Sequence, residues 1–489
     1  MKRIGIIGGG LGALSAAIYL GTTGRYKIDI FEKNESLGGK LGEIHNQGFR
    51  FDTGPSVVTM KSIINDVFHA AAEDPDEYLA YDILSPVNRN FFSDGTFVDT
   101  FSEIDKFRDE IAKISSESAD NLNKYYNRIS GIYKRTADVF LYSQIHEVLH
   151  LIKTGNIPNL FDFTKIDAFS TMHEVNSGYF KNEKILKIFD RYATYNGSSP
   201  HLAPGTLNLI SYVELVLGAY YLKSGIITLP RAFEKILRKY DVQIHLNQEV
   251  DEILVESGTA KGLRVNGVVE NYDYIISNAD VVHTFSKLIR GYENIRSKLE
   301  KVEPSISGMV FLWGVKGVHD NFLHHNVVYS DDYKNEFDEI FTQKKAPSDP
   351  TTYIAITSKT DPEHAPVGCE NWFVLVNMPY LNDNPIDTEE VKSRIFKKLK
   401  SINVDIESKI IFERVITPQD LYNRYLSNKG SIYGISSNSM FTAFKRQSNR
   451  SKVVKNLYFS GGSVHPGGGI PLVILSGKHS AEIIKRLDS

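Results

Sequence analysis

The sequence contains very little cysteine, with Cys369 as the single thiol among 489 residues. One cysteine cannot form an internal disulfide, so disulfide cross-links cannot support the fold, and this usage is typical of a reducing cytoplasm. Outside the glycine-rich opening there is also no uncharged apolar stretch of transmembrane length, which argues against a membrane-spanning helix. The formal net charge is only −3, which gives no indication of a nucleic-acid partner.

What is present is a large apolar fraction. Hydrophobic residues make up 42% of the chain, and its 489 residues are enough for a large core and two intertwined domains. The 27 Phe and 26 Tyr residues are numerous enough to line a long apolar cavity, although we expect most of them in ordinary core positions.

A first glycine-rich segment, Gly8-Gly9-Gly10-Leu11-Gly12-Ala13, lies between an apolar run at 4–7 and a helical pattern from Leu14. This strand, turn and helix order is typical of a loop that holds a pyrophosphate on a helix N-terminus. Gly8 permits the tight turn, Gly10 lets the backbone approach phosphate, and Ala13 takes the third small position. The next strand, 27–31, ends at Glu32, where an acidic residue binds the adenosine ribose.

The first residues, Met1-Lys2-Arg3, resemble the basic start of a signal peptide. Cleavage after the small-residue run that follows would delete the predicted phosphate loop. We therefore expect this segment to form the first strand and helix of the fold and to carry no targeting signal.

A second glycine-rich segment, 461–471, follows a strand-like run at 456–460 and opens a helix at 472–487. Gly467-Gly468-Gly469 lets the backbone pass close to a flat ring, and Pro471 suits the first helical turn. Two such loops, one near each end of the chain, predict a single FAD pocket built from both termini. The helix N-terminus would direct amides toward the flavin N1/C2 edge and favour the anionic reduced form.

The predicted cofactor-binding residues extend beyond these two loops. A glycine turn at 38–41 and the rigid turn Gly54-Pro55-Ser56, which we expect to start a helix, have backbone amides free to face a ligand, and Val250 is predicted to contact adenine through its backbone. The full predicted set is Gly8, Gly10, Leu11, Gly12, Ala13, Glu32, Lys33, Gly39, Lys40, Leu41, Gly54, Pro55, Ser56, Val250, Gly462, Ser463, Gly468, Gly469 and Ile470.

Between about 101 and 168 the pattern is helical, and basic residues flank bulky apolar stretches at 139–152 and 157–163. This segment is compatible with an amphipathic helix in a membrane interface or with a helical pair packed on the core. It also contains His146-Glu147-Val148-Leu149-His150, which matches a zinc-protease motif. No third ligand stands out, so we predict that the match is incidental and expect no metal.

The pattern predicts an α/β fold in which a Rossmann-like FAD-binding domain of the amine-oxidase type is interleaved with an α+β substrate domain. FAD-binding segments are expected at 1–95, 225–290 and 447–489, and substrate-domain segments at 96–224 and 291–446. The segment at 96–224 is also the candidate membrane-associating part. Hairpins are expected around 46–48 and between strands at 250–255 and 261–266.

With these motifs in view, the chain resembles the bacterial carotenoid desaturase family of the phytoene desaturase type over nearly its whole length. The most specific pieces are the first glycine loop, 51–56, and 456–471. The pieces at 195–198, 325–326, 330–333, 365–372 and 430–434 resemble a narrower branch that holds hydroxycarotenoid desaturases and diaponeurosporene-type oxygenases.

The resemblance implies an FAD-dependent enzyme that removes hydride and a proton from a linear apolar carotenoid and so extends its conjugation. The alternatives are an oxygenase that oxidises a terminal methyl group, an oxidoreductase of polar substrates and a non-catalytic carotenoid-binding flavoprotein. The resemblance also implies peripheral attachment to the cytoplasmic membrane, with a quinone or dioxygen as possible electron acceptor. The catalytic base is left open among Asp190, Glu214 and His465, and the tunnel-wall candidates are Tyr192, Tyr195 and Asn196.

Overall fold

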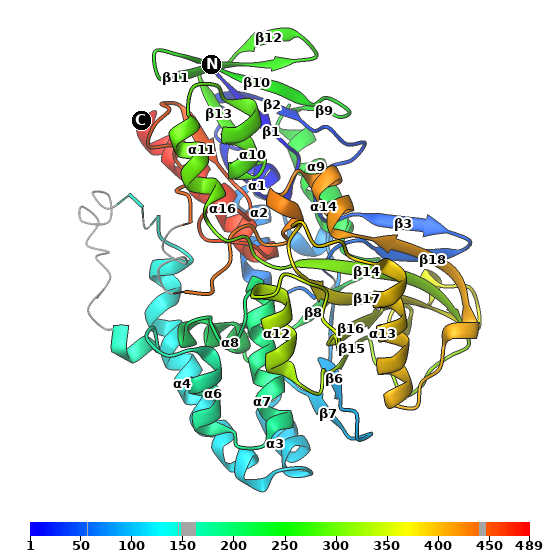
Figure 1. Cartoon of the computed structure of the whole chain (residues 1–489). Coiled ribbons are helices and arrows are strands. Elements are labelled where there is room, and N and C mark those ends of the chain that lie inside the picture. The colour runs from blue at the N-terminus through cyan, green and yellow to red at the C-terminus, as the bar shows by residue number, and fades with distance from the viewer. Residues whose placement is uncertain (56, 145, 148–162, 440–445) are drawn as a thin grey trace.

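The computed structural model describes residues 1–55, 57–144, 146–147, 163–439 and 446–489 (Figure 1). Its first layer is a parallel five-stranded sheet in the order β19-β13-β1-β2-β9. The strands are β1 (Lys2–Ile7), β2 (Tyr26–Phe31), β9 (Gln243–His245), β13 (Tyr274–Ser277) and β19 (Leu457–Phe459). The parallel sheet therefore joins strands from the start, the middle and the end of the chain.

Four helices cover this sheet: α1 (Leu11–Gly21), α2 (Lys61–Ala70), α9 (Thr228–Lys239) and α16 (Ile470–Leu487). α1 and α16 touch along small residues, since a Cβ on Gly477 would lie only 2.2 Å from the carbonyl oxygen of Gly12. Ser15 Oγ also donates a hydrogen bond to Ile474 O at 2.8 Å. The two ends of the chain consequently lie together at the top of Figure 1, where Lys2 pairs with Asp488.

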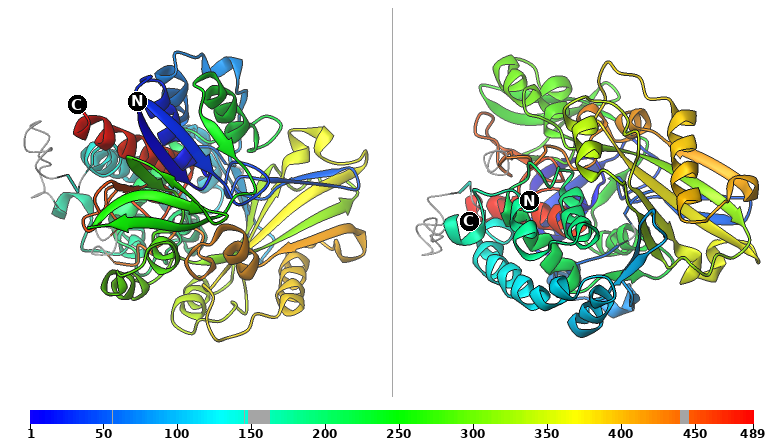
Figure 2. Two further views of the ribbon diagram at one scale, coloured as in Figure 1. Left: turned by 90° about the horizontal axis from the view of Figure 1, so that it is seen from above. Right: turned by 60° about the horizontal axis from the view of Figure 1, so that its bottom comes forward.

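The second layer is a seven-stranded sheet in the order β18-β14-β17-β16-β15-β6-β7, which lies beside the parallel sheet (Figure 2). Its strands are β6 (Asn88–Phe91), β7 (Phe97–Thr100), β14 (Ser307–Lys316), β15 (His325–Val328), β16 (Thr352–Ile356), β17 (Cys369–Met378) and β18 (Ile410–Ile416). Within this seven-stranded sheet, β15 and β6 are the one pair of neighbouring strands that run parallel. β14 and β17 are buried along most of their length because α13 (Thr388–Ser401) packs on one face.

Helices form a third group beside the large sheet (Figure 1). They are α3 (Ile104–Ala112), α4 (Ser116–Phe140), α6 (Met172–Tyr179), α7 (Glu183–Asp190), the 3₁₀ helix η3 (Arg191–Asn196), α8 (Leu209–Leu215) and α12 (Tyr333–Phe341). An aromatic core with Tyr125, Phe180 and Phe189 joins them. Every helix in the described part of the chain is too short or too polar to cross a bilayer.

The remaining elements are small. An antiparallel sheet contains β10 (Val250–Glu256), β11 (Thr259–Val265) and β12 (Val268–Asn271). Two further antiparallel pairs join β3 (Glu43–Asn46) to β4 (Phe49–Asp52) and β5 (Tyr81–Ile83) to β8 (Tyr220–Leu222). Short helices complete the chain: α10 (Val281–His283), α11 (Glu293–Glu300) and α14 (Pro418–Tyr425).

The structure confirms both expected hairpins and the strands and helices that flank the two glycine loops. The helix start expected after Pro55 is wrong. Val58 and Tyr220 instead exchange backbone hydrogen bonds, and α2 begins only at Lys61. The five-segment division stays a prediction, and β6, which falls in its first segment, pairs with β15 of the large sheet.

Much of the candidate membrane segment lies outside the described residues. α4 ends at Phe140, and residues 148–162 are not described. Of the zinc-protease match, His146 and Glu147 are described and 148–150 are not. The His146 ring packs against His465 with centroids 5.7 Å apart, and Glu147 pairs with Arg486 at 2.9 Å, so both described residues have structural contacts.

Candidate flavin site

A cavity of about 490 Å³ lies between the carboxyl ends of the parallel strands and the seven-stranded sheet. This volume falls within the range of about 300–1,000 Å³ that is typical of ligand pockets. Ligands of parallel α/β sheets bind outside the carboxyl ends of the strands, so the position suits a dinucleotide. The wall contains both glycine loops and a group of side chains from the large sheet.

The N-terminal loop exposes backbone groups to the cavity. Gly8 has a φ of +86°, which side-chain-bearing residues rarely adopt. Among the described residues no side chain caps α1, whose N-cap is Gly10, so the amides of its first turn are available to an anion. Glu32 is buried and accepts from Gly9 N at 2.7 Å and from Asn34 N at 2.8 Å. Asn34 Nδ2 also donates to Oε1 at 2.7 Å, so Oε2 is the oxygen with a second lone pair that can accept a ribose hydroxyl.

The glycine turn at 38–39 packs directly against the N-terminal loop. Gly38 N donates to Gly9 O at 2.8 Å, and a Cβ on Gly39 would lie 3.2 Å from Gly10 Cα. Lys40 also lines the cavity, and its Nζ donates to the carbonyl oxygens of Ser431 and Ile432 at 3.2 and 2.5 Å. Burial lowers the pKa of Lys40 to about 8. The turn thus ties the first loop to the 431–432 segment.

The C-terminal loop approaches the same cavity from the other end of the sequence. Gly461, Gly467 and Gly469 have positive φ values of +105°, +146° and +106°. Gly469 is the N-cap of α16, and within the described ranges no side chain caps that helix. A Cβ on Gly468 would lie 2.9 Å from the ring of Tyr433, so this glycine allows Tyr433 to border the cavity.

Asn278 connects the two loops. It follows β13 at the carboxyl edge of the parallel sheet, and its Nδ2 donates to Ser460 Oγ at 3.1 Å. A Cβ on Gly10 would lie 2.5 Å from Asn278 Oδ1, and one on Gly461 would lie 2.8 Å from Nδ2. The sequence analysis missed this residue, although a polar side chain just after a central parallel strand is a usable signal.

The other part of the wall is apolar and comes mainly from the large sheet. Its side chains are aliphatic or aromatic and project from β14, β15 and β17 and from the residue before β14; they are Ile306, Val310, Val327, Phe373 and Leu375. Gly308 of β14 leaves additional space beside them. We call this part the apolar arm; it can accept a hydrocarbon chain and exclude water from it.

A buried polar cluster borders the apolar arm. Arg191, at the start of η3, lies 3.7 Å from Glu214 through Nη2, and both residues are buried. Tyr192 OH donates to Glu214 Oε1 at 2.9 Å, and Tyr195 OH donates to Oε2. Burial lowers the pKa of Arg191, but the neighbouring Tyr195, Tyr329 and Glu214 raise it by more than burial lowers it. The pKa of Arg191 therefore lies well above its ordinary value. Arg191 and Tyr195 face the cavity.

A family model described as flavin-containing amine oxidoreductase matches residues 14–485 of the chain. The chain belongs to this family. It is 36% identical to a 1-hydroxycarotenoid 3,4-desaturase of Flavobacterium sp. over 99% of both chains, and 33% identical to a 4,4'-diaponeurosporene oxygenase of Staphylococcus haemolyticus over 100% of this chain and 98% of the relative. An oxidoreductase structure from Methanosarcina mazei has the same fold, with a TM-score of 0.65, 14% identity and coverage of 99% and 100%.

The chain is therefore a flavin-dependent oxidoreductase with FAD as its cofactor. The cavity fits this assignment because it provides uncapped helix amides for phosphate, a carboxylate for ribose and a glycine-lined wall where added side chains would take up the space. Gly469, whose Cβ would meet no atom within 4 Å, marks free space at this wall.

The structure brings 17 of the 19 predicted cofactor residues to this cavity. Ala13, a residue of α1, is fully buried in the core and does not line the cavity, and Ser56 lies outside the described residues. Which of them touch FAD stays a prediction. The 17 lining residues are Gly8, Gly10, Leu11, Gly12, Glu32, Lys33, Gly39, Lys40, Leu41, Gly54, Pro55, Val250, Gly462, Ser463, Gly468, Gly469 and Ile470.

None of the three candidate bases is among the described residues that line the cavity. Asp190 accepts hydrogen bonds from Asn176 Nδ2 at 2.8 Å and contacts His173 Nδ1 at 2.7 Å. Glu214 is held by the two tyrosines, and His465 Nε2 contacts Ser143 O at 2.9 Å, while burial lowers the pKa of His465 to about 3. Of the tunnel-wall candidates, Tyr195 lines the cavity and Tyr192 and Asn196 lie behind it.

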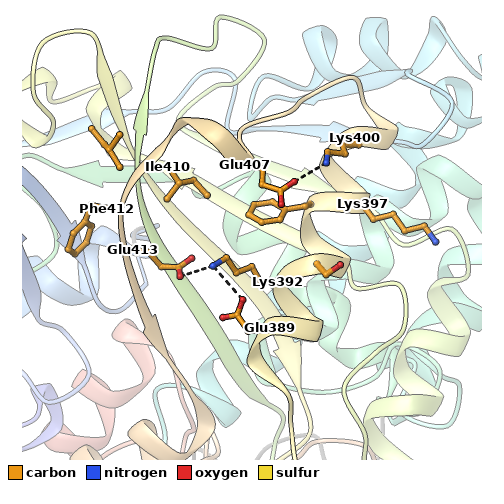
Figure 3. Close-up of a pocket in the computed structure, with 11 residues that line it drawn as sticks. Glu389, Lys392, Lys397, Lys400, Glu407, Ile410, Phe412 and Glu413 are labelled. Carbon is orange, nitrogen blue, oxygen red and sulfur yellow. Dashed lines mark hydrogen bonds and ion pairs between the residues drawn. The ribbon is translucent and has the colours of Figure 1, made fainter.

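A second hollow, of about 740 Å³, lies between α13 and β18 and contains none of the predicted site residues (Figure 3). Two of its lysines are neutralised, since Lys392 pairs with Glu413 at 2.8 Å and Lys400 with Glu407 at 2.9 Å. Its described wall contains no glycine, and the N-terminus of α13, from which Glu389 lines the hollow, is already capped by the side chain of Asp387. It does not compete with the flavin cavity as a cofactor site.

Proposed function

We propose that this flavoprotein is a carotenoid desaturase that removes hydride and a proton from a linear carotenoid and lengthens its conjugated system. The observation that carries the proposal is the union, in one cavity, of both glycine loops with an apolar arm. The full-length similarity to a hydroxycarotenoid desaturase supports the substrate class. A polyene is long and apolar, and the arm offers aliphatic and aromatic walls rather than charges along most of its length.

We infer that the predicted residues hold FAD in an extended arrangement. The amides at the start of α1 would bind the pyrophosphate, Glu32 the ribose, and the loop at 467–470 would lie against the flavin ring. FAD supplies the two-electron acceptor that unactivated C–H chemistry needs and that no side chain provides. The residues of the arm, such as Val310 and Phe373, would orient the chain and exclude water.

The second candidate is an oxygenase that acts on a terminal methyl group, as the similarity to a diaponeurosporene oxygenase suggests. One observation favours it: Arg191 places guanidinium N–H donors beside an otherwise apolar arm, and its Nε has no hydrogen-bond partner among the described residues. Such donors can hold an oxygen atom at a carotenoid terminus. They serve equally a desaturase whose substrate already carries a hydroxyl group, so the products must distinguish the two reactions.

We propose that the protein works at the surface of the cytoplasmic membrane, where carotenoids dissolve. Support comes from the exposed apolar side chains of Phe169, Leu202 and Val216, with exposed fractions of 72%, 49% and 44%, on the helical side of the molecule. Phe169 and Leu202 belong to segments joined by the hydrogen bond from Met172 N to Ala203 O. A quinone in the same membrane, or dioxygen, would reoxidise the cofactor.

The decisive experiment is mass spectrometry of pigments from a host that supplies linear carotenoids, with and without this protein, under ¹⁸O-labelled dioxygen. A desaturase yields products lighter by pairs of hydrogens and free of label. An oxygenase yields a product that carries label at a chain end. A matched control is the Gly12→Val variant, in which a side chain at Gly12 collides with Gly461 N, 2.8 Å from its Cβ position.

Unchanged pigments with every precursor, from protein that carries FAD, would contradict both candidates. They would favour a non-catalytic carotenoid-binding flavoprotein if the purified protein retains a carotenoid. Oxidation of amines by the same preparation would favour a polar-substrate oxidoreductase instead.

A further inference from the structure

Arg446 is a buried arginine that lies directly behind the C-terminal glycine loop. Only 4% of it is exposed, and the Cβ position of Gly467 is 3.4 Å from its guanidinium carbon. Its Nη1 donates to the carbonyl oxygens of Gly462 at 2.8 Å and Tyr433 at 3.2 Å, and both residues line the cavity. The guanidinium therefore contacts the wall of the flavin cavity from the side that faces the protein interior.

The remaining contacts of Arg446 are also neutral. Nη2 donates to Ile435 O at 3.1 Å and to Asn196 Oδ1 at 3.3 Å. Within the described ranges, Arg446 has no carboxylate partner and burial is the only influence on its pKa. The arginines that line the cavity differ in this respect, because Arg191 lies beside Glu214 and Arg424 pairs with Glu35 at 2.9 Å.

Arg446 nevertheless keeps its charge at neutral pH. Burial lowers its pKa to about 10, which leaves the guanidinium protonated. The loop histidine beside it, His465, stays neutral because burial lowers its pKa to about 3. A buried cation without an anionic partner is among the costliest arrangements in a protein interior. Such a charge is expected where a bound anion or a developing negative charge offsets it.

A second positive potential acts at the same place. The 18-residue helix α16 begins at Ile470, and its uncapped N-terminus carries a partial charge of about +0.5. Arg446 and the helix terminus therefore reinforce each other at the loop 467–470, where the flavin ring is predicted to lie. Fixed positive charge in a water-excluded site stabilises negative charge that develops there.

We propose that Arg446 is a positioning residue that fixes the glycine loop and raises the reduction potential of the flavin through its uncompensated charge. The benefit for hydride removal rests on the proposed function, but the potential itself is measurable without any carotenoid. The contacts also explain why Asn196, Tyr433 and Gly462, which are far apart in the sequence, meet at one side chain.

The test compares three variants of the FAD-loaded protein: Arg446→Met, which removes the charge; Arg446→Lys, which keeps it; and Arg450→Met, which removes an exposed charge four residues further on. The midpoint potential is measured by reductive titration against reference dyes. We expect Arg446→Met to lower the equilibrium constant of two-electron reduction by about tenfold, or about 30 mV. Arg446→Lys should stay within about threefold of the parent, and Arg450→Met should match it.

An unchanged midpoint potential in Arg446→Met overturns the proposal. An equal shift in Arg446→Lys and Arg446→Met also overturns it, because the planar shape of the guanidinium would then matter rather than its charge. If Arg446→Met does not retain FAD, Arg446→Gln carries the same expectation, since its amide can still donate to Gly462 O. Loss of FAD in Arg446→Lys as well would assign a purely structural role. An expected potential shift without any carotenoid product contradicts only the proposed function.

Discussion

The two parts of the cavity wall are built by different means. At the nucleotide part, backbone groups and glycines make the surface, and the close approaches lie at Gly10, Gly12 and Gly461. In the apolar arm, side chains make the surface, and a buried charged pair, Arg191 and Glu214, supports it. Changes in the first part should therefore act on cofactor retention, and changes in the second should act on turnover and stability.

The largest effect should follow from Gly12→Val. The new Cβ would lie 2.8 Å from Gly461 N and 3.1 Å from Val473 O, which are backbone atoms that cannot move aside. We expect FAD affinity to fall by about 1,000-fold, or about 4 kcal/mol. Fluorescence titration of the apoprotein with FAD measures this. Gly178→Val is the control because a Cβ there meets nothing within 4 Å; stoichiometric FAD in purified Gly12→Val would contradict the comparison.

Arg191→Met should have the next largest effect, and it should act on stability. The substitution leaves Glu214 buried without its cation, which costs about 3 kcal/mol in the free energy of unfolding. Replacing both residues, in Arg191→Met with Glu214→Gln, should restore most of this loss. Urea unfolding of the FAD-loaded proteins measures both values. Equal loss in the single and double variants would show that the pair contributes no net attraction.

Glu32→Gln should weaken FAD binding without disturbing the arm. The glutamine side chain has a single oxygen, so it can accept from only one of Gly9 N and Asn34 N. Its NH₂ group would then face the other backbone N–H, and two donors would oppose each other. We expect a loss of about 30-fold in FAD affinity, or about 2 kcal/mol. Glu35→Gln is the control because its side chain is mostly exposed. Equal affinity of Glu32→Gln and the parent would remove Glu32 from the predicted site.

Tyr195→Phe should change turnover and leave FAD affinity intact. Tyr192 and Tyr195 both donate to Glu214, but only Tyr195 lines the cavity, so Tyr192→Phe is a matched control for loss of the hydrogen bond. We expect kcat/KM for the carotenoid to fall about fivefold more in Tyr195→Phe than in Tyr192→Phe, which corresponds to about 1 kcal/mol. Parallel losses in the two variants would indicate that Tyr195 acts only through Glu214.

The remaining prediction concerns a pH dependence at the edge of the arm. Burial raises the pKa of Glu336 from 4.5 to about 8, and the carboxyl group accepts from Thr351, a residue of the cavity wall. Because the folded state keeps the proton longer, the contribution to stability is complete below pH 4.5 and declines as pH rises toward 8. The difference in unfolding free energy between the parent and Glu336→Gln should follow this decline. A difference independent of pH would contradict it.

The same contrast explains what the sequence could predict. Gly8, Gly10 and Glu32 belong to one strand-helix-strand unit formed by β1, α1 and β2, so their spacing alone indicates a dinucleotide loop. Arg191 and Tyr433 act through contacts with residues outside their own segments, such as Glu214 and Gly468, and no local pattern marks such contacts. The catalytic base remained open for the same reason, since Asp190 and His465 proved to be engaged with other neighbours.

The helix start expected after Pro55 failed because of a long-range pairing. A Gly-Pro turn is locally compatible with a helix start, but Val58 instead bonds to Tyr220, 162 positions away. By contrast, α16 was predicted correctly because Gly469 and Pro471 give a local start signal. Local signals therefore sufficed wherever the backbone itself builds the site.

The contact between α1 and α16 has a consequence for biosynthesis. A ribosome releases the strand and helix at 2–21 well before their partners at 457–487. At about 5–20 residues per second, this delay is on the order of half a minute to a minute and a half. During that interval the flank of α1 at Gly12 stays uncovered in the nascent chain. The complete cavity wall can therefore form only after 457–487 has emerged, so full retention of FAD should depend on the late-emerging segment.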